Sequence, residues 1–214
     1  MQGAETGRRL VRFQHCQQVI YSFSLPPRCP LCGEDLGARR LEEAALSIAS
    51  PLTNGHQEKC SFLLRPTQGT FLRDYDGQSD LHVGISNTHG IVYNYTAYGM
   101  QRDQVGWEQS VSVPLLPPGM LALLDQWDKY LEDFSADDAW LPHRYEENLH
   151  NCSTFALAFI NGVLRVEGLG PLDKCEFTEK FVLPRTRLTS KYIALYRAVE
   201  VRGFHATAAN PAAC

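Results

Sequence analysis

The sequence of 214 residues has little that would direct the chain to a membrane or to nucleic acid. It lacks any stretch near the roughly 18 consecutive apolar residues of a membrane-spanning helix, and residues 1–14 lack the apolar run of a signal peptide. Its formal net charge of −4 leaves no general excess of basic residues, which nucleic-acid-binding proteins usually have. We therefore expect an intracellular protein, cytoplasmic or nuclear, with no transmembrane segment and no nucleic-acid partner.

Disulfide bonds are a second feature that we do not expect. The chain has seven cysteines, an odd number, and a reducing compartment disfavours a disulfide framework. Four of the cysteines fall in the first 60 residues and the other three are scattered, so the two groups are expected to have different roles. With 44% hydrophobic residues, the chain can bury one sizeable core and carry a small appendage.

Short apolar runs predict an antiparallel sheet in the first half of the chain. Glycine, aspartate and asparagine separate these runs at a spacing of about 8–12 residues, which is typical of a meander. The runs are 60–66, 69–75, 80–86, 90–98 and 107–115. Three- and four-residue periodicity predicts helices at 120–131, 152–164 and 188–199, and the stretch 38–50 also suits a short helix.

These patterns predict an α+β fold, an antiparallel sheet packed on a buried helix. The helix at 152–164 is apolar nearly all round, so we expect it to be the buried one. We expect three regions along the chain: an N-terminal hairpin with a knuckle-like turn over 1–60, the α+β domain over 61–203 and a disordered tail over 204–214.

A histidine and a cysteine stand on the two best-defined elements of the expected domain. His82 lies on the strand 80–86, and Cys152 lies in the first turn of the buried helix. An imidazole can take the proton of a thiol, and the positive end of a helix dipole stabilises the thiolate, so the pair suits a thiol nucleophile. The alternative is that Cys152 has no chemical role, because a cysteine on an apolar helix is usually buried and inert.

Further groups could complete such a site. Asn151 marks the start of the helix, where unpaired backbone N–H groups could form part of an oxyanion hole. A third residue usually orients the imidazole, and His89, Asn94 and Asp80 are all near enough in sequence to His82 to do so.

Two segments carry a resemblance to known enzyme families. The segment 80–101, DLHVGISNTHGIVYNYTAYGMQ, resembles the histidine-bearing hairpin of the permuted papain-fold peptidases called the PPPDE family. The segment 145–162, YEENLHNCSTFALAFING, is similar to the block around the nucleophile in that family and in lecithin:retinol acyltransferase-like enzymes. Ser153-Thr154 departs from the usual polar pair after the nucleophile.

This resemblance implies a circularly permuted papain-like fold, since the histidine precedes the cysteine. It implies that His82 is the general base and Cys152 the nucleophile. The families include isopeptidases that act on ubiquitin-like proteins, and phospholipid acyltransferases or thioesterases. A ubiquitin-like protein or a peptide is therefore the partner that the resemblance implies.

Nearly the whole chain also resembles the makorin-2 opposite-strand protein family, a resemblance that implies no activity. It is carried by the blocks 54–85, 106–115 and 123–152.

The early cysteines suggest a metal site. Cys29 and Cys32 form a C-x2-C knuckle, and His56 and Cys60 follow after 23 residues, which suits a tetrahedral site for structural zinc. His15 and Cys16 compete as ligands for the same ion. The alternative is a loop with reduced cysteines and no metal.

Three hypotheses about function remain open at this point. The first is a thiol hydrolase that uses Cys152 and His82 on an isopeptide, a peptide or a thioester. The second is a catalytically inactive protein-binding module of the same fold. The third is a structural or interaction protein that has no active site, in which Cys152 is merely buried.

Overall fold

The computed structural model describes residues 8–37, 41, 43–116 and 121–209. The chain forms two compact units: the first comprises Met1–Ser50 and Ser190–Cys214, and the second comprises Pro51–Thr189. The first boundary falls near residue 50, where the sequence analysis placed it at residue 60. Residues 190–214, which come last in the chain, belong to the first unit.

The first unit contains a four-stranded antiparallel sheet in the order β3-β1-β2-β9. Its core is formed by Phe13, Ile20, Cys29 and Leu36. The four strands are β1 (Leu10–His15), β2 (Gln18–Ser22), β3 (Leu46–Ile48) and β9 (Phe204–Ala208).

Two expectations for this unit are corrected by the sheet. Phe204–Ala208 forms strand β9, which pairs with β2, although we expected a disordered tail from residue 204. Phe204 and Ala206 pack against the core, so the apolar side chains of this strand help to hold it in the sheet. Leu46–Ile48 forms β3 rather than part of a helix. The rest of the tail, 210–214, and positions 38–40 and 42 lie outside the described residues.

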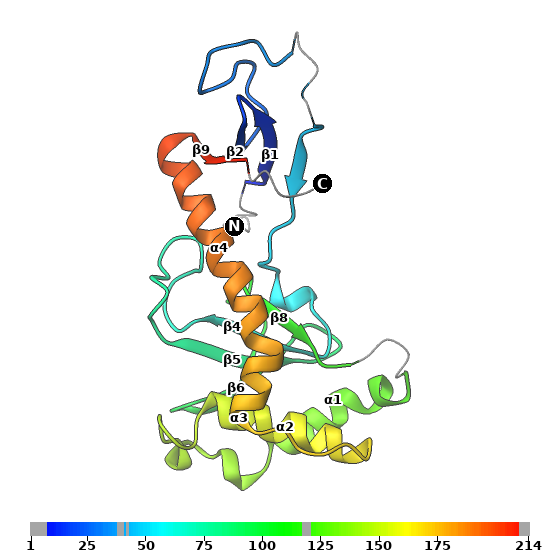
Figure 1. The fold of residues 1–214 in the computed structure, drawn as a ribbon. Coiled ribbons are helices and arrows are strands. Elements are labelled where there is room, and N and C mark those ends of the chain that lie inside the picture. Colours follow the sequence, from blue (N-terminus) through cyan, green and yellow to red (C-terminus); the bar gives the residue numbers. More distant parts are fainter. Residues whose placement is uncertain (1–7, 38–40, 42, 117–120, 210–214) are drawn as a thin grey trace. The chain divides into compact units, whose positions relative to one another are not determined.

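The second unit contains a five-stranded antiparallel sheet in the order β7-β6-β5-β4-β8 (Figure 1). Four of its strands fall on the predicted apolar runs, and the combination of an antiparallel sheet with helices is the α+β class that we predicted. Its strands are β4 (Ser61–Pro66), β5 (Leu81–Ser86), β6 (Val92–Thr96), β7 (Gly99–Asp103) and β8 (Val111–Pro114).

The run 69–75 does not form a strand. Gly69 has a φ of 69°, and the Asp74 carboxylate accepts a hydrogen bond of 2.7 Å from the Thr70 backbone N–H, so this segment closes as a turn. Strand β7 was not predicted, because its sequence GMQRD is largely polar, yet it pairs with β6 over its full length.

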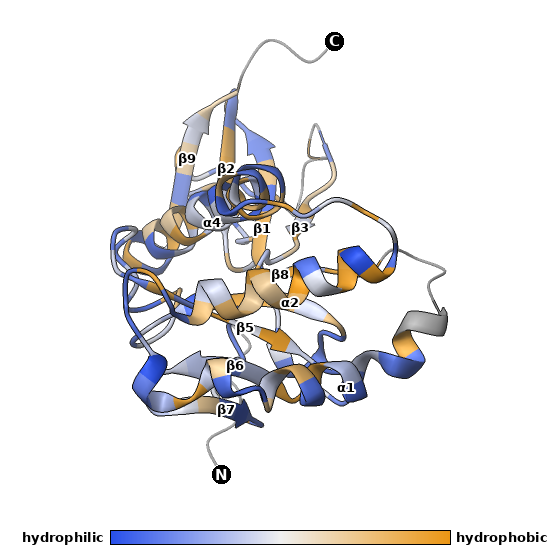
Figure 2. Cartoon of the chain, turned by 90° about the horizontal axis from the view of Figure 1, so that it is seen from below, coloured by the Kyte–Doolittle hydropathy of each residue, from blue (hydrophilic) through white to orange (hydrophobic). Residues whose placement is uncertain are grey.

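Helices cover the sheet of the second unit on one side, where α1 and α2 run side by side (Figures 1 and 2). Trp127 and Tyr130 of α1 contact Phe159 of α2, with ring centroids 5.0 and 5.3 Å apart. Helix α2 is largely hydrophobic (Figure 2), and the residues that it buries include Phe155 and Phe159. The prediction of a buried helix packed on the sheet is therefore confirmed.

The helices are bounded as follows. The α-helices are α1 (Leu121–Ser135), α2 (Cys152–Val166), α3 (Lys174–Phe177) and α4 (Leu183–Arg202). Short helical turns lie at η1 (Gly55–Gln57), η2 (Asp138–Trp140), η3 (Pro142–Arg144) and η4 (Thr178–Val182). Among the described residues, none of the helices combines the length and the apolar character needed to cross a membrane.

Gly84 lets neighbouring groups approach strand β5 closely. A Cβ at this position would lie 2.7 Å from Val92 Cγ1, 3.0 Å from the Tyr93 carbonyl oxygen and 3.1 Å from Trp107 Cη2. Val92 and Trp107 are fully buried and form a small core with Leu63. The glycine therefore fixes how β6 and the Trp107 ring sit against the strand that carries His82.

Candidate active site and metal-binding cluster

Cys152 is the first residue of helix α2, and a complete capping box fixes its position. The Asn151 side chain accepts hydrogen bonds from the backbone N–H groups of Ser153 and Thr154, at 2.9 and 3.3 Å. In return, the Asn151 backbone N–H donates to the Thr154 hydroxyl at 2.6 Å. The Asn151 Nδ2 donates to the Glu147 carbonyl oxygen at 2.5 Å, so this amide ties the helix start to the loop before it.

The Cys152 thiol is largely buried, with 8% of the residue exposed, and it interacts with His82 on strand β5. Burial by itself would raise the pKa of the Cys152 thiol. The hydrogen bond and charge of His82, with a further hydrogen bond from the Val83 backbone, outweigh burial, so the pKa lies below its ordinary value. The predicted helix-start cysteine and strand histidine are thus brought together.

The pKa of His82 shifts in the opposite direction, upward. Burial would lower the pKa of its imidazole, but the hydrogen bond and charge of Cys152, together with a hydrogen bond to Asn94, raise it above the ordinary value. The charge of Arg65, which lies opposite His82 on β4, acts to lower it. A raised imidazole pKa and a lowered thiol pKa both favour a thiolate–imidazolium pair.

Asn94 is hydrogen-bonded to the His82 imidazole. Its Oδ1 lies 2.8 Å from His82 Nε2, while its Nδ2 donates to the Asp103 carboxylate at 2.8 Å. A carboxylate only accepts hydrogen bonds, so the amide oxygen must face the histidine, and Nε2 must carry a proton. Nδ1 is then the nitrogen left for Cys152. Asp103 also accepts from the Trp107 indole N–H at 3.0 Å, which holds the array in place.

The other orienting candidates lie elsewhere. His89 is exposed, and its Nδ1 lies 2.8 Å from the Asp128 carboxylate, to which the Thr88 hydroxyl also donates. Asp80 contributes its backbone carbonyl to a hydrogen bond with the Thr67 N–H. Of the three candidates, Asn94 is the one that the structure places against His82, and His89 and Asp80 make other contacts.

Two neighbours of the site were not anticipated. Asp103 is on β7, the strand that the sequence pattern missed, so no local signal could have connected it to His82. Tyr145 is close enough to Cys152 for the thiolate charge to contribute, after burial, to the raised pKa of its phenol. It packs on Tyr95, with ring centroids 5.3 Å apart.

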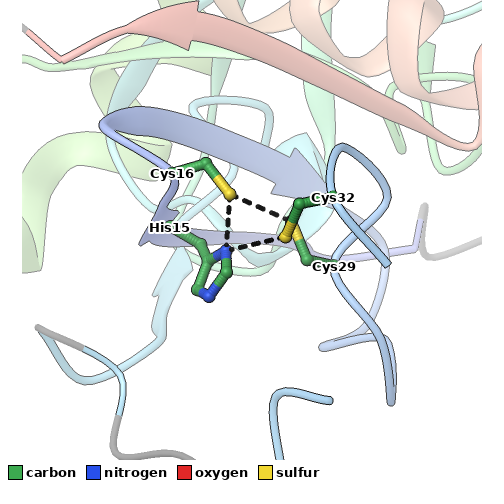
Figure 3. A group of neighbouring side chains, drawn as sticks. All are labelled: His15, Cys16, Cys29 and Cys32. Carbon is green, nitrogen blue, oxygen red and sulfur yellow. Dashed lines mark hydrogen bonds between the residues drawn. The ribbon is translucent and has the colours of Figure 1, made fainter. Parts of the chain in front are cut away.

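A separate cluster lies in the first unit and consists of His15, Cys16, Cys29 and Cys32 (Figure 3). One ligand-type atom from each residue lies within 4.8 Å of the others, so the cluster could hold a metal ion. Cys29 and Cys32 come from the predicted knuckle. His15 and Cys16, the competing ligands of the sequence analysis, come from the turn between β1 and β2.

His56 and Cys60, the other two expected ligands, take part in other contacts. The His56 Nδ1 lies 2.8 Å from the Gly90 carbonyl oxygen, and its Nε2 accepts from the Trp107 backbone N–H at 3.3 Å. Burial raises the pKa of the Cys60 thiol to about 12, so this thiol stays protonated. The structure therefore groups the knuckle with His15 and Cys16, while both ring nitrogens of His56 make contacts within the second unit.

The fold and these two sites define an α+β protein with a buried thiol–imidazole–amide array and a separate His/Cys cluster. The chain belongs to the DUF4796 family: residues 45–199 match its C-terminal region, described as DUF4796 C-terminal, and residues 8–36 match DUF4796 N-terminal. It is 66% identical over 207 residues to the MKRN2 opposite strand protein of Homo sapiens, covering 97% of this chain and 93% of that protein. The resemblance to the makorin-2 opposite-strand family is thereby confirmed. No solved structure matches the chain.

Proposed function

We propose that this protein is a thiol hydrolase in which Cys152 is the nucleophile, His82 the general acid and base, and Asn94 the positioning residue for His82. The observation that supports this most strongly is the paired shift in pKa, down for the thiol and up for the imidazole. A merely buried cysteine would have a raised pKa, as Cys60 has.

The first half of the proposed reaction is acyl transfer to the enzyme. The Cys152 thiolate attacks the carbonyl carbon of the substrate, and the negative charge moves to the carbonyl oxygen. When the tetrahedral intermediate collapses, the bond to the leaving group breaks and the proton on His82 Nδ1 passes to that group. The products are a free amine or thiol and an acyl thioester on Cys152.

Water completes the cycle. His82, now neutral, removes a proton from water, and the hydroxide adds to the thioester carbonyl. Collapse of this second intermediate releases the carboxylic acid and returns the thiolate–imidazolium pair. Asn151 already caps the Ser153 and Thr154 N–H groups, so the backbone N–H of Cys152 is the helix donor that we propose for the oxyanion in both steps.

The proposed fold is a circularly permuted papain-like domain, in which the histidine strand precedes the helix with the nucleophile. The resemblance of residues 80–101 and 145–162 to isopeptidases and thioesterases supports an isopeptide, a peptide or a thioester as substrate. A ubiquitin-like protein or a peptide is the partner that an isopeptide substrate would bring.

Acylation by an activated ester tests the proposal. With p-nitrophenyl acetate, the wild-type protein should release a burst of about one nitrophenolate per chain and carry one acetyl group on Cys152, identified by peptide mass spectrometry. Cys152→Ser should abolish the burst, and His82→Ala should slow it by about 100-fold or more. Cys175→Ser removes an exposed thiol and serves as the matched control, which should keep the burst.

Either of two results would contradict the hydrolase. One is acetylation at Cys175 or Cys32 but not at Cys152. The other is an acetylated Cys152 whose rate of formation is unchanged in His82→Ala. If the wild-type protein forms no acyl adduct yet still binds ubiquitin-like proteins, the inactive binding module replaces the hydrolase.

A further inference from the structure

We propose that His15, Cys16, Cys29 and Cys32 bind one zinc ion in a closed structural site of one imidazole and three thiolates. The four ligand atoms lie within 4.8 Å of one another, and they come from two separate turns of the first unit (Figure 3). This site goes beyond the thiol chemistry proposed for Cys152 and shares no residue with it.

The spacing of the ligand atoms suits a tetrahedral ion. With Zn–S bonds of about 2.3 Å and Zn–N bonds of about 2.0 Å, neighbouring ligand atoms stand about 3.5–3.8 Å apart. His15 Nδ1 lies 3.6 Å from Cys32 Sγ, and Cys16 Sγ lies 4.0 Å from Cys29 Sγ. The contact of 2.9 Å between His15 Nδ1 and Cys16 Sγ is shorter, and it would have to lengthen by about 0.6 Å when the ion binds.

The surroundings of the ligands are those of a metal site. His15 presents Nδ1 to the sulfurs, and its Nε2 lies 3.5 Å from the Glu34 carboxylate, the arrangement that usually orients a zinc-bound imidazole. The Leu31 backbone N–H donates to Cys29 Sγ at 3.4 Å, which helps to disperse thiolate charge. Gly33, with a φ of 79°, closes the knuckle through a 2.9 Å bond to the Cys29 carbonyl.

The turn that carries Cys16 is unusual in a way that the metal would explain. Cys16 and Gln17 form the two-residue loop between β1 and β2, with φ values of 53° and 56°. Such loops favour Asn-Gly, because positive φ is unfavourable for other residues. Here the left-handed backbone turns Cys16 toward the knuckle, so a zinc–sulfur bond would compensate for the strained conformation.

Zinc fits the donor set better than the alternatives. A disulfide between Cys16 and Cys29 would need sulfurs about 2.05 Å apart, and they lie at 4.0 Å. Three thiolates in so small a volume would repel one another without a cation, and soft sulfur ligands with an imidazole select zinc in a tetrahedral geometry. Binding would release the three thiol protons, and four protein ligands leave no open position, so the ion would be structural.

Metal analysis of the full chain, purified under reducing conditions with zinc, tests the site. We expect one zinc per chain by plasma mass spectrometry, and cobalt exchange should give the sulfur-to-cobalt charge-transfer bands and visible bands of a tetrahedral thiolate site. His15→Gln and Cys32→Ser should lose stoichiometric zinc. Glu34→Gln should weaken zinc binding by about 10- to 100-fold, since it acts through His15.

Two controls separate this ligand set from the one suggested by spacing. His56→Gln and Cys175→Ser should each keep one zinc per chain. Loss of zinc in His56→Gln with retention in His15→Gln would overturn the assignment. Because a ligand variant could fail to fold, the wild-type protein provides an independent test: saturating zinc or cobalt without a stoichiometric, tetrahedral spectrum would overturn the site without any substitution.

Discussion

Burial raises the pKa of the Cys152 thiol, and the neighbouring His82 imidazole lowers it. The effect of the imidazole is the larger one, so the pKa of the thiol lies below its ordinary value. Asn94 contributes to this balance, because its amide oxygen accepts from His82 Nε2 and this bond helps to raise the pKa of the imidazole. Asp103 and Trp107 in turn hold the amide. The imidazole that faces this thiol is thus part of a chain of hydrogen bonds across three strands and a loop.

Removing the positioning amide should make Cys152 less reactive at neutral pH. The hydrogen bond that His82 donates to Asn94 contributes to the raised pKa of His82, so Asn94→Ala should lower that pKa and leave less imidazolium to stabilise the thiolate. The apparent pKa of Cys152 should then rise by up to about one pH unit, the equivalent of one hydrogen bond. The pH profile of alkylation at Cys152 measures this shift.

Asn161→Ala is the matched control for that substitution. Asn161 lies on the same helix as Cys152, but its amide bridges both backbone groups of Leu172 at 2.9 Å. Its removal should lower the melting temperature without moving the alkylation midpoint. Equal midpoints for Asn94→Ala and wild type would show that Asn94 has no influence on the imidazole.

The residues of the array differ in how well sequence could predict them. Cys152 and His82 each stand on an element with a clear local pattern, so their pairing could be proposed from the chain alone. The sequence could not decide between Asn94 and His89 as the partner of His82. Both follow His82 closely in the chain, and the choice depends on how β6 pairs with β5. Asp103 could not be predicted from the sequence, because it lies on a polar strand that has no apolar alternation.

At the scale of the elements, Gly84 controls the approach of β6 and Trp107 to β5. Gly84→Ala would place a methyl group 2.7 Å from Val92 Cγ1 and 3.0 Å from the Tyr93 carbonyl oxygen, which is backbone and cannot rotate away. We expect a loss of about 1–3 kcal/mol in the free energy of unfolding, as for other overpacked cores. Chemical denaturation measures the change.

Gly170→Ala is the control, because a Cβ at Gly170 would meet no atom within 4 Å. Gly170→Ala should leave the free energy of unfolding unchanged or raise it slightly, because alanine restricts the conformations of the unfolded chain. If Gly84→Ala were as stable as Gly170→Ala, the close packing around β5 would not be what positions the histidine strand.

The elements that sequence predicted well are those with strong hydrophobic periodicity, above all α2 and β5. The elements that it missed carry little such signal: β7 is polar, and β9 is built from FHATA. Both are specified by pairing with a neighbouring strand rather than by their own composition. The opposite error occurred at 69–75, where an apolar run is closed by the turn between Gly69 and Asp74.

For the whole molecule, the two proposed sites are contributed by different units. Every residue of the thiol–imidazole–amide array lies within Pro51–Thr189, and every residue of the His/Cys cluster lies within Met1–Ser50. The C-x2-C knuckle was visible in the sequence, which offered both His15/Cys16 and His56/Cys60 as its partners. The structure brings His15 and Cys16, from the β1–β2 turn, next to the knuckle.

This division predicts that metal and thiol chemistry are independent. A strong chelator should remove the proposed zinc and lower the unfolding temperature of the protein, since metal binding is linked to folding. The alkylation rate of Cys152 at neutral pH should stay within about twofold of the untreated value. A much larger change in that rate on chelation, measured before unfolding begins, would contradict the independence of the two sites.

The activated Cys152–His82 pair is tested most directly by the pH dependence of iodoacetamide labelling at Cys152, read by peptide mass spectrometry in wild type and His82→Ala. Cys175, exposed in the same chain, provides the internal reference. Because the pKa of Cys152 is lowered by His82, we predict a wild-type labelling midpoint below the ordinary thiol value of about 8.5, and a midpoint above that value in His82→Ala, where burial is no longer opposed by the imidazole. A wild-type midpoint above about pH 8 that is indifferent to His82 would contradict the activated pair.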